Sequence, residues 1–273
     1  MLAPYPTDVG TASTGLLTNP PITLAPMTDL DEICAAQQET QDALSRLFRK
    51  GSISFGSNRE LGRSLRSLEI GSTLSAAELL HIASLLENAA RVKAYGKKER
   101  EDAPSDSLTP LFDGISPISQ LSSEINRCIL SEEEISDDAS PGLKHVRRSM
   151  TLTTERIHSQ LAGMVNGSLH GYLQDALVTS RNGRYCIPVK AEYRSQVPGM
   201  VHDQSSSGST LFIEPAAVVN LNNQMRELEV QEQEEIVKVL ASLSVQVEQH
   251  SEDIAENQRI LTQLDFAFAK ASL

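Results

Sequence analysis

The chain has 273 residues, of which 40% are hydrophobic, 4% are aromatic and none is tryptophan. This length suffices for one large domain or two small ones, and the few aromatic residues predict long helices packed through aliphatic side chains. The three distant cysteines, Cys34, Cys128 and Cys186, exclude a disulfide framework, and no apolar run reaches the roughly 18 residues of a membrane span. A net charge of −12 disfavours broad contact with nucleic acid, so any such contact must be local.

The N-terminal segment has the composition of an unstructured chain. Residues 1–26 are rich in Pro, Gly, Thr and Ser and show no apolar period, so we expect them to be disordered or atypical. They carry no secretion signal, and we therefore expect a cytoplasmic protein. Residues 27–176 are expected to form a helical region. Its first helix uses Thr28 as N-cap and ends near Gly51, and glycines interrupt the stretch from there to Leu74.

The most regular helix of this region follows Ser75. Ser75 and Glu78, three residues later, form a capping box, and apolar residues recur on one face as far as Gly96, which is expected to be the C-cap. A charged linker that contains proline follows. These signals predict one amphipathic helix with sharp ends, followed by an exposed connection.

Two more helices are expected before the composition changes. A shorter one lies within residues 117–130. A longer one uses Ser140 as N-cap and Pro141 as the first helical residue, where the missing N–H of proline costs no hydrogen bond. We expect this longer helix to continue to about Val165.

Residues 177–215 are different in character and predict a small antiparallel sheet of three or four strands. Asn182-Gly183 lies between two β-branched segments and is a strong signal for a two-residue hairpin, because both turn positions need positive φ. Pro188 cannot donate to a ladder, so its strand needs a free edge or a bulge there. Residues 197–204 and 209–215 form a second pair of strands joined by a serine-rich turn.

Residues 216–273 are expected to form a long returning helix, since neither Gly nor Pro occurs after Pro215. Unbroken, it would span roughly 85 Å, and it would have to project as an arm or pack along another long helix. The alternative is two helices that meet near Glu248–Ser251. The apolar residues that step by three and four are Leu221, Met225, Leu228, Ile236, Val239, Leu243, Val247, Ile254, Leu261, Leu264 and Phe268.

The predicted sheet carries a local excess of basic residues. Arg181, Arg184, Lys190 and Arg194 are candidate contacts for nucleic-acid phosphates, and five glutamates in residues 227–235 confine this positive charge to the sheet. The same four side chains are equally compatible with solvated positions on an open strand face. Both interpretations remain open from charge alone.

Three other kinds of site find no support in the sequence. The serine-rich turn lacks the lysine of a P-loop and joins two strands instead of a strand and a helix. His202, Asp203 and Ser205 do not suggest a nucleophilic triad, because neighbours on a strand point to opposite faces. No histidine or cysteine spacing suits a metal. We therefore predict no catalytic, cofactor or metal residue in this chain.

Residues 178–229 closely resemble the hallmark segment of the bacterial MutS-two family, paralogues of the mismatch-repair MutS ATPases. The resemblance continues in residues 248–273, which are similar to the returning lever helix of that family. It extends more weakly to residues 24–33, 67–93 and 135–148. The resemblance implies a MutS-like helical core with long lever helices and a clamp region, so the fold is expected to be mainly α with a small antiparallel β-sheet.

The family resemblance also implies parts and partners beyond these residues. Family members continue into an ATPase domain, which uses ATP and Mg, and usually an Smr endonuclease-like domain. They form homodimers, suppress recombination by binding branched DNA, and recognise and split collided ribosomes. No P-loop occurs here, so we expect a fragment that comprises the core, the lever and the base of the clamp. It is expected to grip branched DNA or ribosomal RNA; the alternative is a purely structural or oligomerisation module.

Overall fold

The chain folds into two units that alternate along the sequence. The computed structural model describes residues 28–56, 61–97 and 105–273, and the predicted N-terminal segment 1–26 lies outside these residues. One unit extends to Ser136 and resumes at Leu240–Leu273, and the other comprises Asp137–Val239. The division crosses the predicted helical region 27–176, because the last helix of that region packs against the sheet.

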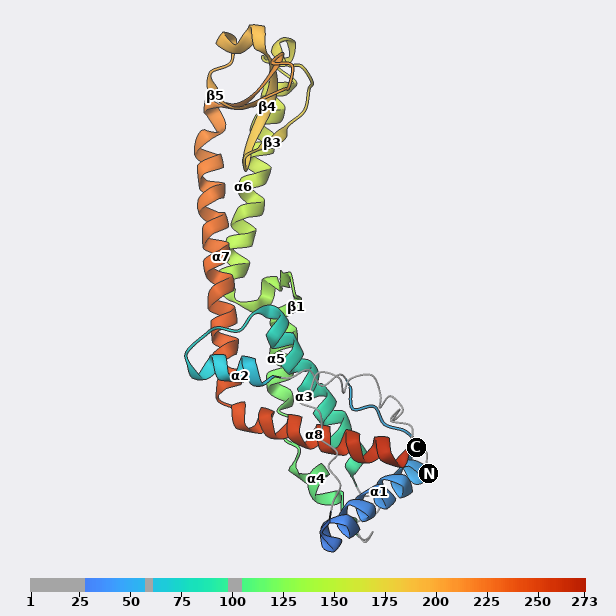
Figure 1. The fold of residues 1–273 in the computed structure, drawn as a ribbon. Helices are drawn as coiled ribbons and strands as arrows, with labels where there is room; N and C mark the ends of the chain where they lie inside the picture. The colour runs from blue at the N-terminus through green and yellow to red at the C-terminus, as the bar shows by residue number, and fades with distance from the viewer. Residues whose placement is uncertain (1–27, 57–60, 98–104) are drawn as a thin grey trace. The chain divides into compact units, whose positions relative to one another are not determined.

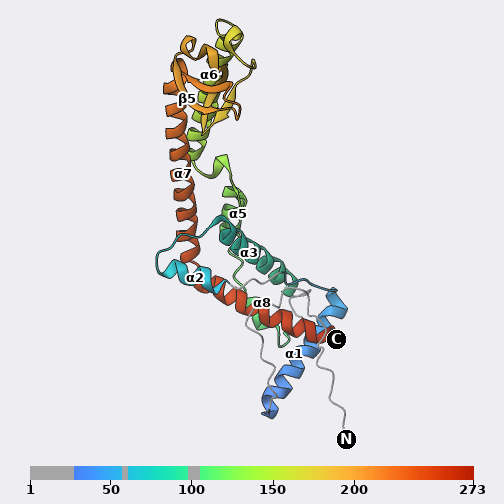
Figure 2. The same ribbon diagram turned by 45° about the horizontal axis from the view of Figure 1, so that its top comes forward.

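The first unit is helical apart from one short hairpin (Figures 1 and 2). Its helix α3 contacts α4, α5 and α8, and α1 also packs on α8. Four aromatic rings, those of Phe55, Tyr95, Phe112 and Phe268, meet with centroids 5.2 to 6.4 Å apart. The elements are α1 (Leu30–Lys50), α2 (Gly62–Glu69), α3 (Ala76–Gly96), α4 (Thr109–Gly114), α5 (Ser119–Cys128), β1 (Ile129–Ser131), β2 (Glu134–Ile135) and α8 (Ser251–Ala271).

Local signals place most helix ends correctly, with small corrections. The capping box of Ser75 and Glu78 is confirmed at the start of α3. The N-cap of α1 is Asp29 instead of Thr28, because the Asp29 carboxylate accepts from two amides of the first turn. Gly96 is the last residue of α3 and not its cap, and it lies against the ring of Phe112, where a side chain would overlap. Helix α2, within the stretch expected to be broken, was not predicted.

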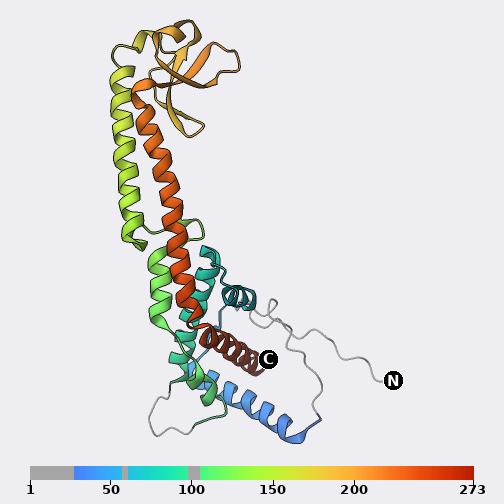
Figure 3. The ribbon, with the colours of Figure 1, turned by 90° about the vertical axis from the view of Figure 1, so that its left-hand side faces the viewer.

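The second unit joins two helices through a four-stranded sheet (Figure 3). The strand order is β3-β4-β6-β5, and every neighbouring pair is antiparallel. This confirms the predicted mainly α fold with a small antiparallel sheet. Helix α6 begins at Pro141 after the Ser140 cap and ends at Val165, as predicted. The elements are α6 (Pro141–Val165), β3 (Thr179–Arg181), β4 (Arg184–Lys190), β5 (Gly199–Gln204), β6 (Thr210–Pro215) and α7 (Val219–Glu248), of which the residues from Leu240 on belong to the first unit.

The predicted hairpin joins β3 to β4. Asn182 and Gly183 have φ of 51° and 71°, and Arg181 faces Arg184 across the turn. Beyond the end of β3, the carbonyl of Pro188 accepts from the amide of Gln174. Since N–H and C=O of one strand residue point the same way, the N–H that proline lacks would point to this side, where β3 has ended. Pro188 therefore interrupts no ladder.

One face of the sheet forms the core of the second unit. Alternate residues of β4 and β6, among them Ile187, Val189 and Ile213, are fully buried against the last turns of α6. The opposite face, called the outer face here, is consequently formed by the residues between them. The buried cluster comprises Ile157, Leu161, Val165, Leu173, Ile187, Val189, Val197, Ile213 and Val218.

The C-terminal segment 216–273 is two helices, the second of the alternatives that the sequence leaves open. Helix α7 ends at Glu248, and α8 begins at Ser251 after His250, whose φ of −117° and ψ of 15° are not helical. The single long helix is therefore corrected. Helix α7 alone has 30 residues, or about 45 Å at 1.5 Å per residue. Among the described residues, no helix combines the length and apolar character needed to cross a membrane.

Candidate nucleic-acid interface

The outer face brings together three of the four predicted basic residues. Arg181 and Arg184 are paired in the β3–β4 register, and Lys190 lies on the same side of β4 because strand residues alternate. On β6 the same face presents Phe212 and Glu214, which alternate with core residues. Basic side chains therefore share this face with an acidic one, and their partners decide what each can do.

Glu214 is almost fully buried and stands at the centre of a polar network. Its Oε2 lies 2.6 Å from His202 Nε2, and its Oε1 accepts from Arg184 Nη1 at 3.1 Å and from Asn222 Nδ2 at 2.8 Å. Burial opposes ionisation, but the hydrogen bonds from His202 and Asn222 and the charge of Arg184 outweigh it and lower the pKa of Glu214. Glu214 thus engages Arg184 inside the protein.

Asn222, the fourth residue of α7, continues the sheet with a side chain. The Tyr185 amide donates to Asn222 Oδ1 at 3.1 Å, and Asn222 Nδ2 donates to the Tyr185 carbonyl at 3.2 Å. In an antiparallel ladder these two groups of Tyr185 point away from β3, where β6 no longer pairs with β4. The carboxamide takes the place of a strand residue, which fixes the start of α7 to the sheet.

Arg181 is the most accessible of the paired arginines. Its guanidinium carbon lies 4.0 Å from the centroid of the Phe212 ring, and its Nε lies 3.2 Å from Asp203 Oδ2. The side chain of Arg181 is 36% exposed and that of Asp203 is 48% exposed. An ion pair this open contributes little to stability, so another anion can replace Asp203 at low cost.

Lys190 and Arg194 differ in how firmly they are held. Lys190 Nζ lies 6.0 Å from the centroid of the Tyr193 ring, and within the described part of the chain it has no carboxylate partner. Arg194 donates to the carbonyls of Val197 and Gly199 at 3.1 and 2.9 Å, which fixes the turn that leads into β5. Lys190 is therefore free to contact a ligand, whereas Arg194 supports the backbone.

The sequence did not identify Glu214, His202 or Asn222 as parts of one arrangement. A β-bulge between Val201 and Asp203 shifts the register and places His202 beside Glu214. His202 and Asp203 accordingly contact different groups, which leaves no basis for a triad with Ser205. Burial, together with the charge of Glu214, raises the pKa of the neighbouring Cys186 thiol to about 11, so this cysteine is protonated at neutral pH. The only sequence signal for the network around Glu214 was this glutamate itself, which alternates with the core residues of β6.

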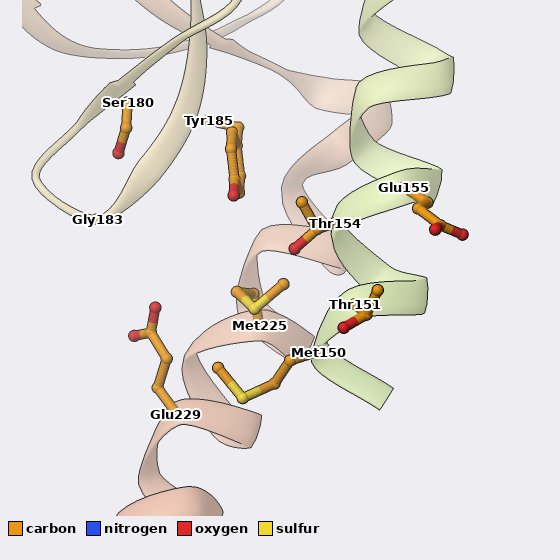
Figure 4. A pocket seen from close by; sticks show the side chains of 9 residues that line it. All are labelled: Met150, Thr151, Thr154, Glu155, Ser180, Gly183, Tyr185, Met225 and Glu229. Carbon is orange, nitrogen blue, oxygen red and sulfur yellow. The ribbon is translucent and has the colours of Figure 1, made fainter. Parts of the chain in front are cut away.

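A cavity of about 420 Å³ lies between α6, α7 and the β3–β4 hairpin (Figure 4). Its walls carry the hydroxyls of threonine, serine and tyrosine side chains and two methionines, and no Lys, Arg or His lines it. Glu229 lines it and already pairs with Arg226 at 2.7 Å. The cavity does not fit a phosphate. Its lining residues are Met150, Thr151, Thr154, Glu155, Ser180, Gly183, Tyr185, Met225 and Glu229.

Comparisons with known proteins identify relatives for nearly all of the chain. No family model matches it. It is 54% identical over 253 residues to a protein named Endonuclease MutS2 from Agathobacter rectalis. Proteins of the same name from Lachnoclostridium phytofermentans and Lachnospira eligens are 50% and 48% identical over 256 and 251 residues. Each match covers 92% of this chain, which spans about a third of the length of these relatives. The chain therefore belongs to the MutS2 family, as the resemblance at residues 178–229 predicted.

Proposed function

We propose that this chain supplies a nucleic-acid contact of a MutS2 protein through the outer face of its sheet. The observation that carries the proposal is the position of Arg181, whose guanidinium is stacked on Phe212 and partly open to solvent. Lys190 adds a second cation with no carboxylate partner among the described residues. Stacking on Phe212 holds the guanidinium of Arg181 in place, together with hydrogen bonds that its Nη1 donates to Thr179 Oγ1 and the Ser180 carbonyl. Its Nη2 can donate to a phosphate oxygen.

Arg184 and Arg194 have supporting roles in this proposal. Arg184 offsets the buried charge of Glu214, and Arg194 holds the entry into β5. Removing either would disturb the sheet, and binding would fall as a consequence of that change. Of the four sequence candidates, Arg181 and Lys190 are thus proposed as direct contacts, and Arg184 and Arg194 as positioning residues.

The proposed target is a phosphodiester backbone, bound without reading of sequence. Branched DNA and ribosomal RNA both present such a backbone. The name Endonuclease MutS2 belongs to the relatives and assigns no activity to this chain. Suppression of recombination, rescue of collided ribosomes, homodimerisation and the use of ATP and Mg are proposals for the whole protein. So is the lever role of α7, whose internal hydrogen bonds keep its length of about 45 Å fixed.

A salt series tests the phosphate contact. The 273-residue chain is titrated with a four-way DNA junction and, separately, with ribosomes, while the salt concentration is varied. We expect affinity to fall with salt, and the Arg181→Ala/Lys190→Ala variant to reduce the slope of log K against log salt by about two, near 0.9 for each phosphate contact. Arg63→Ala/Arg66→Ala is the matched control, since both arginines are exposed on α2 and their loss changes the net charge equally. A slope that is the same in wild type and the sheet variant refutes the assignment.

The second candidate function is a structural module that assembles through α7. Val230, Val237 and Val245 recur at steps of seven and eight along this helix and are 60%, 60% and 53% exposed. Exposed valines at this spacing are typical of a helix that packs against another. Analytical ultracentrifugation discriminates the two candidates, because a tight dimer that is not retained on immobilised DNA or RNA supports assembly alone.

A further inference from the structure

Helix α6 presents a row of basic side chains that the sheet does not explain. Its buried side comprises Leu143, Val146, Thr153, Ile157, Leu161 and Val165. On the opposite side, Lys144, Arg148, Leu152 and Arg156 follow one another at intervals of four residues, and all four are exposed. Residues at this spacing lie on one helix face. We call Lys144, Arg148 and Arg156 the basic face of α6.

The two arginines of this face are uncommitted. Within the described residues, neither Arg148 nor Arg156 takes part in a hydrogen bond or an ion pair. Lys144 pairs with Asp138 at 2.6 Å, but both side chains are about two-thirds exposed. By contrast, Arg147 turns toward α7 and binds Asp137 and Glu232 at 2.5 and 2.7 Å. The helix therefore separates structural cations from free ones.

The charges around this face favour a polyanion. Helix α6 has one acidic residue, the exposed Glu155, which follows Arg148 by seven residues and therefore lies on the same face. Its four Lys and Arg residues still leave the helix with three more cations than anions. Helix α7, in contrast, carries six glutamates and two basic residues. The positive potential of the second unit is thus strongest on the side of α6 and the sheet, away from α7.

We propose that the basic face of α6 is a second contact for the phosphate backbone, and that it binds a nucleic-acid duplex. The inference rests on the proposed function, since it assumes that the chain binds nucleic acid. Along the helix axis, Lys144 and Arg148 are about 6 Å apart and Arg148 and Arg156 about 12 Å. A duplex carries about one charge per 1.7 Å, so all three cations find phosphates without any change of the helix. The free arginines lose no internal partner on binding.

The test uses the complete 273-residue chain, a duplex DNA, a duplex RNA of the same sequence, and the variant Arg148→Ala/Arg156→Ala. Two phosphate contacts predict a decrease of about 1.8 in the slope of log K against log salt, and a loss of affinity of about 60-fold at 0.1 M salt. Arg148→Lys/Arg156→Lys is expected to keep the slope, because a point charge suffices for counterion release. Arg63→Ala/Arg66→Ala on α2 again controls for net charge, and circular dichroism checks that every variant is folded.

The outcomes separate this inference from the proposed function. A reduced slope in the α6 variant and not in the α2 control supports the basic face. A comparison of the affinities for the DNA duplex and the RNA duplex then shows which nucleic acid is preferred. An α6 variant that binds like wild type overturns the inference, even when the Arg181→Ala/Lys190→Ala variant is impaired and the sheet assignment stands. Equal binding to vesicles rich in anionic phospholipid overturns it as well. A chain that binds neither duplex nor junction overturns both proposals.

Discussion

Replacing Asn222 with alanine is expected to disconnect α7 from the sheet. The side chain is 1% exposed and makes three hydrogen bonds, two with the backbone of Tyr185 and one with Glu214. Alanine would leave the N–H and C=O of Tyr185 without partners, and each unsatisfied buried group costs about 1 to 3 kcal/mol. We therefore expect the free energy of unfolding of the second unit to fall by about 3 kcal/mol.

Hydrogen exchange is the suitable assay, because a chain of two units need not unfold in one step. The Tyr185 amide reports the effect directly, since its acceptor in the wild type is Asn222 Oδ1. A loss of about 3 kcal/mol corresponds to a decrease in its protection factor of roughly two orders of magnitude. Amides of the first unit serve as an internal reference and should keep their protection.

Two neighbouring substitutions control this prediction. Asn223 is exposed and accepts one hydrogen bond from Arg184, so Asn223→Ala should cost less than about 1 kcal/mol. Asn222→Asp keeps the acceptor for the Tyr185 amide but brings a second carboxylate to Glu214, and it should be at least as unstable as Asn222→Ala. Equal protection of the Tyr185 amide in wild type and Asn222→Ala would refute the reasoning.

Other predictions concern pH, thiol reactivity and packing. Because the pKa of Glu214 is lowered on folding, its contribution to stability is present above the ordinary carboxyl pKa and lost as the pH falls through the lowered value. The free energy of unfolding, measured at a series of acid pH values, should therefore depend less steeply on pH for Glu214→Gln. Iodoacetamide at neutral pH should label the exposed Cys34 in the native protein and the buried Cys186, with its pKa of about 11, only after denaturation, as peptide mass spectrometry can show. Gly96→Ala should lower the urea midpoint of the first unit by the equivalent of about 1 to 3 kcal/mol, because the methyl group would overlap the ring of Phe112.

Features set by neighbouring residues could be predicted from the sequence. The adjacent residues Ser140 and Pro141 specify the start of α6, and Asn182-Gly183 supplies the two positive φ angles of the hairpin. In both places the required conformation is available to few residue types. The signal is therefore independent of the rest of the fold.

The break between α7 and α8 was harder to predict, because no Gly or Pro marks it. The apolar stripe passes from Val247 to Ile254 in a step of seven, which is also what one continuous helix would show. The available signal was the run Ser251, Glu252 and Asp253, whose acidic residues suit the first turn of a new helix. The periodicity outweighed this signal, because a pattern of apolar positions indicates which face of a helix is buried and not whether the helix is continuous.

The partners of the basic residues could not be predicted, because they depend on strand register. Arg181, Arg184, Lys190 and Arg194 are the same kind of residue in the sequence, yet Arg184 meets a buried glutamate thirty residues away. The encounter depends on the pairing of β4 with β6 and on the adjacent bulge, which neither composition nor spacing specifies. Likewise, the free cations on α6 become apparent only when each ion pair of the second unit is assigned.

The segregation of charge in the second unit predicts how binding should respond at very low salt. Residues 141–214 contain eight Lys and Arg and five Asp and Glu, whereas the part of α7 in this unit, residues 219–239, contains two Lys and Arg and five Glu. At 0.1 M salt the screening length of about 10 Å is close to one helix diameter, so the acids on the far side of α7 hardly affect a duplex on α6. At 0.01 M the screening length grows to about 30 Å and these acids repel the duplex.

Plots of log K against log salt should therefore bend toward weaker binding at the lowest salt concentrations. Glu227→Gln/Glu234→Gln should straighten them without changing the slope near 0.1 M, and a straight wild-type plot would show that the two sides of the unit are not electrostatically distinct.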